Sequence, residues 1–203
     1  VISGYANNIL FENGTTLIIE NNTLLIEGNL KLNGKIDLNN ESQLVQDTGS
    51  TFDSTSSGTI EIDQQGTSDN FKYNYWGSPV YTTTTTGNTY TIEGVLRDGT
   101  DPTIKTINFG THYTYADGAV TIPIKLSSYW MYKFDNKTTS DYNSWSRVGK
   151  DGVLKPGEGY TMKGSNSDST EQNYTFVGKP NNGNIYLPIN TGKQYLIGNT
   201  YPS

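Results

Sequence analysis

The sequence contains no cysteine and a single histidine, His112, among its 203 residues. Without cysteine there is no disulfide and no thiolate metal site. One histidine cannot supply the ligand sets of zinc enzymes. It lies in the strand-like stretch 111–115, where a surface residue is a simpler interpretation than a catalytic base. The sequence therefore argues against nucleophile–base catalysis and against zinc chemistry.

Positive charge and long apolar runs are also scarce. The chain has 14 Lys and Arg against 20 Asp and Glu, a net charge of −6, with no basic cluster. A phosphate backbone or an anionic membrane surface would be repelled, so we expect no nucleic-acid partner. No stretch approaches the roughly 20 apolar residues of a membrane span, so we expect none.

Alanine is rare, whereas strand and turn residues are abundant. Three alanines stand against 22 glycines, 7 prolines and 15 tyrosines. Aromatic and β-branched side chains favour strands, and glycine favours turns with positive φ. Six Asp-Gly or Asn-Gly pairs are candidate chain reversals. The composition predicts an all-β protein with little helix.

Residues 9–66 consist of short apolar runs that recur every six to eight residues between Asn, Gly, Asp and Ser. Such short strands suit the faces of a parallel β-solenoid, whose coil takes roughly 20 residues. We therefore predict a short β-solenoid over residues 1–68, with two or three coils. A plain antiparallel meander is the alternative, which the pairs Asn13-Gly14 and Asn33-Gly34 keep open.

The remainder of the chain, residues 69–203, predicts a β-sandwich module that caps the solenoid. Nine short strand-like runs separated by turn residues are typical of a sandwich. The open end of a short solenoid needs a cap, because its unpaired backbone invites association. The predicted strands cover residues 71–75, 89–96, 103–108, 120–125, 130–134, 159–163, 174–178, 184–189 and 194–197.

One loop is a candidate structural calcium site. Calcium takes oxygen ligands from Asp, Asn and backbone carbonyls. Residues 135–143 offer Asp135, Asn136, Asp141 and Asn143, without the pattern of an EF-hand. Asp98 with Asp101 is a smaller candidate pair. We expect no other cofactor.

The 24 aromatic residues have two interpretations. Exposed rings form stacking platforms in sugar-binding surfaces, and buried rings fill a core. We expect core packing for Trp76, Trp130 and Trp145. A coplanar row of exposed rings would instead favour a carbohydrate-binding module.

Several motifs in the second part resemble one family. Residues 75–80 read Tyr-Trp-Gly-Ser-Pro-Val, 154–160 Leu-Lys-Pro-Gly-Glu-Gly-Tyr, 177–183 Val-Gly-Lys-Pro-Asn-Asn-Gly, and 196–203 Leu-Ile-Gly-Asn-Thr-Tyr-Pro-Ser. In order and spacing they resemble large adhesin-like surface proteins of Bacteroidota that the type IX secretion system exports. The family usually has proline where this chain has Thr200. It offers no catalytic residue that could be transferred.

The resemblance implies a location and a partner. A secreted protein displayed on the outer cell surface would contact the type IX secretion machinery through a C-terminal sorting region. That region is missing from this sequence, so we expect a piece of a longer protein. Asp53-Ser54-Thr55 and Asp168-Ser169-Thr170 are similar to the O-glycosylation acceptor pattern of this phylum, which makes Ser54 and Ser169 candidate glycan sites and the protein a glycoprotein.

The sequence thus predicts a non-catalytic structural or adhesive module that meets other surface proteins or polysaccharide. The alternative is a carbohydrate-binding module or an accessory domain of a polysaccharide-degrading enzyme. A glycosidase is a third hypothesis, which requires two carboxylates about 5 to 9.5 Å apart in a cleft.

Overall fold

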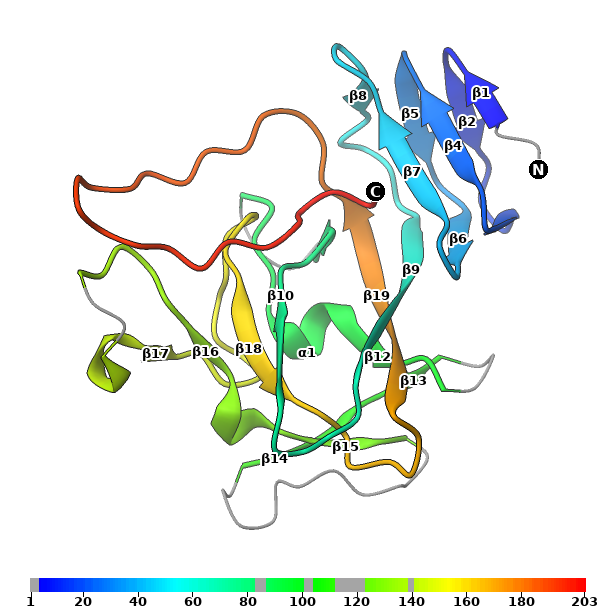
Figure 1. Ribbon diagram of the computed structural model, residues 1–203. Helices are drawn as coiled ribbons and strands as arrows, with labels where there is room; N and C mark the ends of the chain where they lie inside the picture. The colour runs from blue at the N-terminus through cyan, green and yellow to red at the C-terminus, as the bar shows by residue number, and fades with distance from the viewer. Residues whose placement is uncertain (1–3, 83–86, 101–103, 112–122, 139–140) are drawn as a thin grey trace.

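The computed structural model describes residues 4–82, 87–100, 104–111, 123–138 and 141–203 (Figure 1). Strands make up 44% of the protein and helix 6%, which confirms the all-β prediction. His112, Asp101 and the first half of the predicted strand 120–125 lie outside the described residues.

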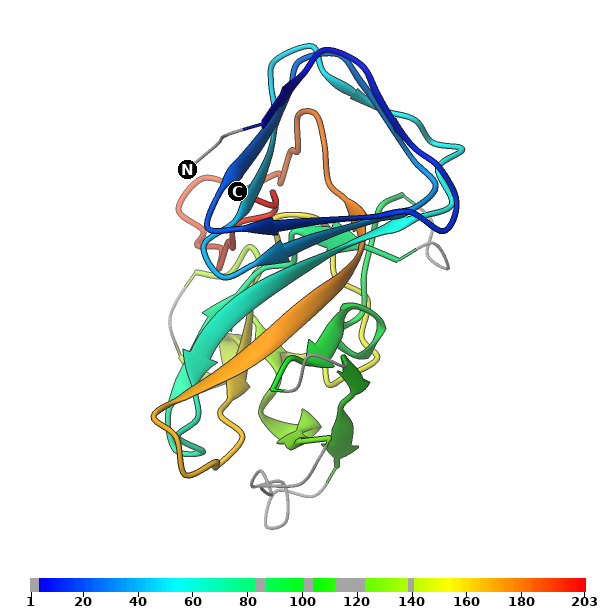
Figure 2. The same ribbon diagram turned by 90° about the vertical axis from the view of Figure 1, so that its right-hand side faces the viewer.

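The first part of the chain is a parallel β-solenoid, as predicted, and its strands form three faces. Figure 2 looks along its triangular coils. Each face stacks three strands. Their pairing is parallel, so the antiparallel meander is wrong. The faces consist of β1 (Gly4–Ala6), β4 (Thr23–Ile26) and β7 (Gln43–Gln46); β2 (Ile9–Phe11), β5 (Asn29–Leu32) and β8 (Thr51–Phe52); and β3 (Thr16–Glu20), β6 (Lys35–Asn39) and β9 (Thr59–Thr67).

Alternation along the short strands builds the solenoid core. In β4, β5 and β6, every second side chain is buried, because successive residues of a strand point to opposite faces. The register places like residues above one another, so that Leu24 pairs with Leu44, and Ile36 pairs with Ile60. These apolar stacks run through the coils and hold them together.

The longest strand of the solenoid also belongs to the second part of the protein. β9 pairs in parallel with β6 and antiparallel with β19 (Glu171–Pro180), from Ile60 opposite Gly178 to Thr67 opposite Glu171. One seven-stranded sheet therefore runs through both parts. Six strands follow the order β13-β12-β19-β9-β6-β3, where β12 is Leu96–Asp98 and β13 is Lys105–Thr106, and β11 (Val80–Tyr81) pairs with β19. The predicted boundary after residue 68 falls where β9 ends.

The C-terminal residues cover a second face of the last coil. The Leu44 N–H donates to the Pro202 carbonyl oxygen at 2.7 Å, and Asn182 Nδ2 donates to the Ser50 carbonyl oxygen at 3.0 Å. Pro202 is buried, and Figure 1 shows the chain end beside β7. The end of the solenoid is thus capped by both β19 and the C-terminal segment.

The second part contains several small sheets, and the predicted β-sandwich is not confirmed. A four-stranded antiparallel sheet has the order β10-β18-β16-β17, and the parallel pair β14 and β15 stands apart. The elements are β10 (Tyr73–Trp76), β11 (Val80–Tyr81), α1 (Ile92–Val95), β12 (Leu96–Asp98), β13 (Lys105–Thr106), β14 (Asn108–Gly110), β15 (Lys125–Ser127), η1 (Ser128–Trp130), β16 (Tyr132–Lys133), η2 (Tyr142–Ser144), β17 (Ser146–Arg147) and β18 (Tyr160–Lys163).

Three of the predicted strands are wrong. Residues 92–95 form the helical turn α1, because the Thr91 side chain accepts the Gly94 N–H at 3.1 Å and caps it. Residues 184–189 and 194–197 form no strand. The latter segment makes isolated bridges instead, one between Gln194 and Lys137 and one between Ile197 and Glu158.

Candidate functional site: an aromatic groove

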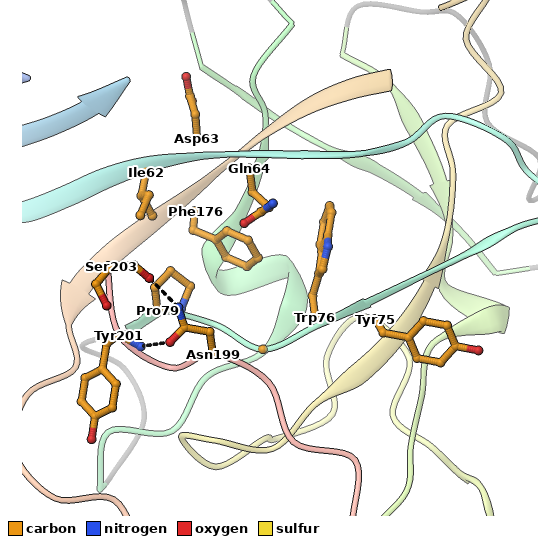
Figure 3. A pocket seen from close by; sticks show the side chains of 11 residues that line it. Ile62, Asp63, Gln64, Tyr75, Trp76, Pro79, Phe176, Asn199, Tyr201 and Ser203 are labelled. Carbon is orange, nitrogen blue, oxygen red and sulfur yellow. Dashed lines mark hydrogen bonds between the residues drawn. The ribbon is translucent and has the colours of Figure 1, made fainter. Parts of the chain in front are cut away.

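The site begins with the alternation of side chains along β10. Trp76 is half-buried and packs edge-on against the core residue Tyr174, with ring centroids 4.9 Å apart. Tyr73 and Tyr75 point to the opposite face of the sheet and are 37% and 59% exposed. In Figure 3 the rings of Tyr75 and Trp76 accordingly lie on different sides of the strand.

The register of β18 adds two side chains to the same face. Tyr73 stands opposite Lys163, and Tyr75 stands opposite Thr161. Directly opposed residues of an antiparallel pair share a face, so Lys163 and Thr161 lie beside the two tyrosines. Their neighbours Tyr160 and Met162 are buried in the core on the other face.

The other two strands of this sheet extend the face. Tyr132 of β16 stands opposite Arg147 of β17, so these side chains also share a face. Thr161 Oγ1 donates to the Trp130 carbonyl oxygen at 3.0 Å and accepts the Tyr132 N–H at 3.2 Å. This buried threonine fixes the backbone that presents Trp130 and Tyr132.

These elements enclose a hollow of about 210 Å³, which we call the aromatic groove. It is smaller than the roughly 300–1,000 Å³ of most small-molecule pockets, which suits a ligand that lies along a surface. None of the described residues that line it carries a carboxylate. The lining residues are Tyr73, Tyr75, Trp130, Tyr132, Tyr142, Trp145 and Thr161.

Two of the predicted core tryptophans therefore belong to the groove. Trp130 and Trp145 are half-buried and line it, whereas Trp76 packs on the core as expected. The Trp145 ring is supported from beneath by Phe134, at 5.2 Å between centroids. Tyr142, in η2, is 67% exposed and stands 6.5 Å from the ring of Tyr132.

Two tyrosines of the groove, Tyr132 and Tyr73, have raised pKa values. Burial, together with the hydrogen bond and charge of Tyr142, raises the pKa of Tyr132 to about 12. Burial also raises the pKa of Tyr73. Near neutral pH these groups are hydroxyl donors and acceptors beside apolar rings, a combination that suits a ligand with both C–H faces and hydroxyl groups.

Two cations lie on the same face of the sheet as the groove, outside its lining. Lys163 Nζ lies 3.9 Å from the centroid of the Trp130 ring and 5.6 Å from that of Tyr73. The Arg147 guanidinium lies 6.0 Å from the centroid of the Tyr129 ring. In the described part of the chain neither cation has an ion-pair partner.

A second hollow, of about 230 Å³, lies where β9, β10 and the C-terminal segment meet (Figure 3). Its polar side chains are already engaged. Asp63 accepts from Thr175 at 2.8 Å, and Asn199 accepts the Tyr201 N–H while donating to the Ser203 carbonyl oxygen. The first bond joins β19 to β9, and the other two lie within the C-terminal segment, so these polar groups already have partners in the fold.

The candidate calcium loop is partly engaged in other contacts. The Asp135 carboxylate lies 3.1 Å from Lys133 Nζ, and Asn136 Oδ1 accepts the Asn190 N–H at 2.9 Å. Asp141 Oδ2 accepts from Asn143 Nδ2 at 3.5 Å. Nowhere in the described residues do three His, Cys, Asp or Glu side chains gather as a metal site would require. Calcium binding stays a prediction.

The smaller calcium candidate, Asp98, is used by the backbone. Its carboxylate is buried and accepts the N–H groups of Thr100 and Ile124 at 2.9 and 2.8 Å. Its predicted companion Asp101 lies outside the described residues. Asp98 therefore organises the loops that follow β12 and precede β15.

Both candidate glycan acceptors are exposed. Ser54 occupies a turn in which the Asp53 carboxylate accepts from the N–H and hydroxyl of Thr55. Ser169 lies between β18 and β19, and its carbonyl oxygen accepts from the Ser68 hydroxyl. Glycosylation requires such exposure, and the modification itself stays a prediction.

A buried carboxylate lies behind the sheet, in the Pro-Gly-Glu-Gly motif. Glu158 is 2% exposed and lies 3.3 Å from Lys133 Nζ. It also accepts from the Tyr195 hydroxyl at 2.5 Å and the Lys155 N–H at 2.9 Å. Burial and the hydrogen bond to Glu158 raise the pKa of Tyr195. The motif thus anchors the C-terminal segment.

No helix in the described part of the chain has the length and apolar character that a membrane crossing requires. Comparison of the sequence with protein-family models and with curated proteins, and of the structure with solved structures, found no match.

Proposed function

We propose that this protein is a non-catalytic structural and adhesive module of a secreted bacterial cell-surface protein, and that it adheres to carbohydrate through the aromatic groove. One observation carries the proposal: six aromatic side chains gather on one face of a small sheet. They come from β10, η1, β16, η2 and the residue directly after η2.

The chemistry of the groove favours a sugar over other ligands. Ring faces carry negative charge density, and the C–H faces of sugar rings are apolar and weakly positive, so the two stack. Tyrosine hydroxyls at the same surface can exchange hydrogen bonds with sugar hydroxyls.

The solenoid and its cap supply the structural half of the proposal. A rigid stack of coils holds the groove away from whatever precedes it. The contact of Trp76 with Tyr174 and Phe176, across the space between β10 and β19, supports a sandwich-like packing of residues 69–203. The motif resemblance supports type IX secretion and display on the outer surface, and the two Asp-Ser-Thr patterns support glycosylation at Ser54 and Ser169.

A panel of soluble polysaccharides tests the proposal, with affinity measured by calorimetry or gel retardation, in calcium and in EDTA. We expect saturable binding that Tyr142→Ala weakens at least tenfold. The control is Tyr186→Ala, since Tyr186 is 82% exposed and does not line the groove. Binding to none of the polymers, or binding that Tyr142→Ala leaves intact, would contradict the proposal. Loss of binding in EDTA would support a calcium site.

A further inference from the structure

We infer that the sugar taken by the aromatic groove is acidic, with a carboxylate or sulfate group that pairs with Lys163 and Arg147. The inference rests on the proposed function and names its ligand class. Both cations lie on the face of the sheet that carries the groove, through the pairs Tyr73 opposite Lys163 and Tyr132 opposite Arg147.

The position of Lys163 makes it a ligand-binding cation. Its ammonium group lies over the Trp130 ring and near Tyr73, so a sugar stacked on the neighbouring rings of the groove would meet it. The contact with Trp130 replaces part of its water, which strengthens its attraction to an anion. Because none of the described lining residues is acidic, an incoming carboxylate meets no competing negative charge within the groove.

Arg147 supplies the second charge, on another strand of the sheet. In the sheet order β10-β18-β16-β17, Tyr132 lies on β16, between Lys163 on β18 and Arg147 on β17. The cations therefore lie to either side of Tyr132. A guanidinium also offers paired N–H donors, which suit a planar carboxylate or a sulfate.

The net charge of −6 does not decide against an acidic ligand. At physiological ionic strength charges are screened beyond about 8 Å, so the groups at the groove outweigh the rest of the surface. Six other lysines are neutralised or held elsewhere: Lys31, Lys35, Lys72, Lys133 and Lys150 by ion pairs, and Lys105 by a separate interaction.

The test compares trigalacturonate with its methyl ester, which has the same sugar backbone without the charge. We expect the acid to bind about tenfold more tightly, and the difference to shrink as salt increases. Lys163→Met keeps the aliphatic stem over Trp130 and should weaken binding of the acid roughly fivefold while leaving the ester unchanged. Arg147→Met should act in the same direction. Lys179→Met, on β19, makes the same charge change away from the groove and should alter neither.

Other outcomes separate this inference from the proposed function. Equal binding of acid and ester, abolished by Tyr142→Ala, would overturn the acidic ligand and leave carbohydrate binding in place. If Lys163→Met and Lys179→Met weaken binding of the acid equally, the effect comes from net charge alone, and the pairing of the ligand with Lys163 is wrong. The affinities for sulfated and unsulfated dextran are compared in the same way. This comparison distinguishes a preference for sulfate from a preference for carboxylate. Binding to none of these sugars would contradict both proposals.

Discussion

Thr161 and Trp130 are joined by a hydrogen bond of 3.0 Å from the threonine hydroxyl to the tryptophan carbonyl oxygen. The same hydroxyl accepts the Tyr132 N–H, so one buried side chain fixes both ends of the turn that presents two rings of the groove. The shape of the groove therefore depends on a residue that has no ring.

Replacing Thr161 with valine should destabilise the protein and loosen the groove. Valine has the same shape but no hydroxyl, so the Trp130 carbonyl oxygen and the Tyr132 N–H lose this partner, at a cost of about 1–3 kcal/mol. The free energy of unfolding in urea measures the loss, and Thr161→Ser, which keeps the hydroxyl, is the control. If Thr161→Val and Thr161→Ser lower the free energy of unfolding equally, the hydrogen bonds of the Thr161 hydroxyl do not contribute to stability.

The Glu158 carboxylate should be one of the most sensitive polar groups in the protein. Glu158→Gln keeps its size but removes the charge that pairs with Lys133 and receives the Tyr195 hydroxyl. Breaking a buried pair costs about 3–5 kcal/mol when the remaining charge is left without a partner. Lys133 keeps Asp135 at 3.1 Å, so we expect a smaller loss of about 1–3 kcal/mol, from the buried hydrogen bonds of Glu158. Thermal unfolding measures the loss. Asp69→Asn, in the exposed pair with Lys72, should cost less than about 1 kcal/mol, and equal effects would contradict the prediction.

The solenoid could be predicted because its information is local. Leu24, Leu30 and Ile36 recur every six residues, and each lies inside a different face. Stacking one coil on the next then requires only that the period repeat. The local signal also marked turns correctly at Gly14 and Gly183, which have φ of 79° and 75°.

The groove could not be predicted, because it depends on register between distant segments. Tyr73 and Trp145 are far apart in the sequence, and three strand pairings bring them to one face. The β9–β19 pairing likewise joins residues about 100 positions apart. Trp130 and Trp145 are expected in the core, because the sequence around a half-buried ring does not differ from the sequence around a fully buried one. Alternation in Tyr73-Asn74-Tyr75-Trp76 was the one available hint.

Gly198 should tolerate no side chain. A Cβ atom there would lie 2.2 Å from the Gly77 nitrogen and 2.5 Å from its Cα, so two backbones cross in contact. Both glycines belong to motifs that carried the family resemblance, and this crossing gives a physical reason for them. Gly198→Ala should cost about 1–3 kcal/mol or more in urea unfolding. Its neighbour Ile197 is 68% exposed, so Ile197→Ala should have little effect. Equal stability of both variants would argue against a tight crossing.

Stability should fall in alkali above pH 10. Burial and Tyr142 raise the pKa of Tyr132 to about 12, whereas an unfolded tyrosine ionises near 10. A raised folded pKa contributes stability that is complete below pH 10 and is lost as the pH rises towards 12. Burial disfavours the charge of Lys133, but Asp135 and Glu158 outweigh it and raise its pKa, which acts in the same direction.

Urea midpoints between pH 7 and 12 check this prediction. We expect a plateau followed by a decline, and a shallower decline in Tyr132→Phe, which has no phenol to titrate. A urea midpoint that increases as the pH rises above 10 would contradict the expected loss of stability. A decline of the same steepness in Tyr132→Phe would assign the effect to other groups.

Removing residues 199–203 should expose the end of the solenoid to association. Leu44 would lose its acceptor, the Pro202 carbonyl oxygen, and Asn181 Nδ2 would lose the Thr200 carbonyl oxygen at 3.0 Å. The edge of β7 would then present unpaired backbone groups, which pair readily with a second copy. We expect lower stability and a mass that rises with concentration in light scattering. Deletion of Ser203 alone keeps both acceptors and should leave a monomer. If the shortened protein is also monomeric at every concentration, pairing by the C-terminal segment is not what protects this edge, and β19 alone caps the solenoid.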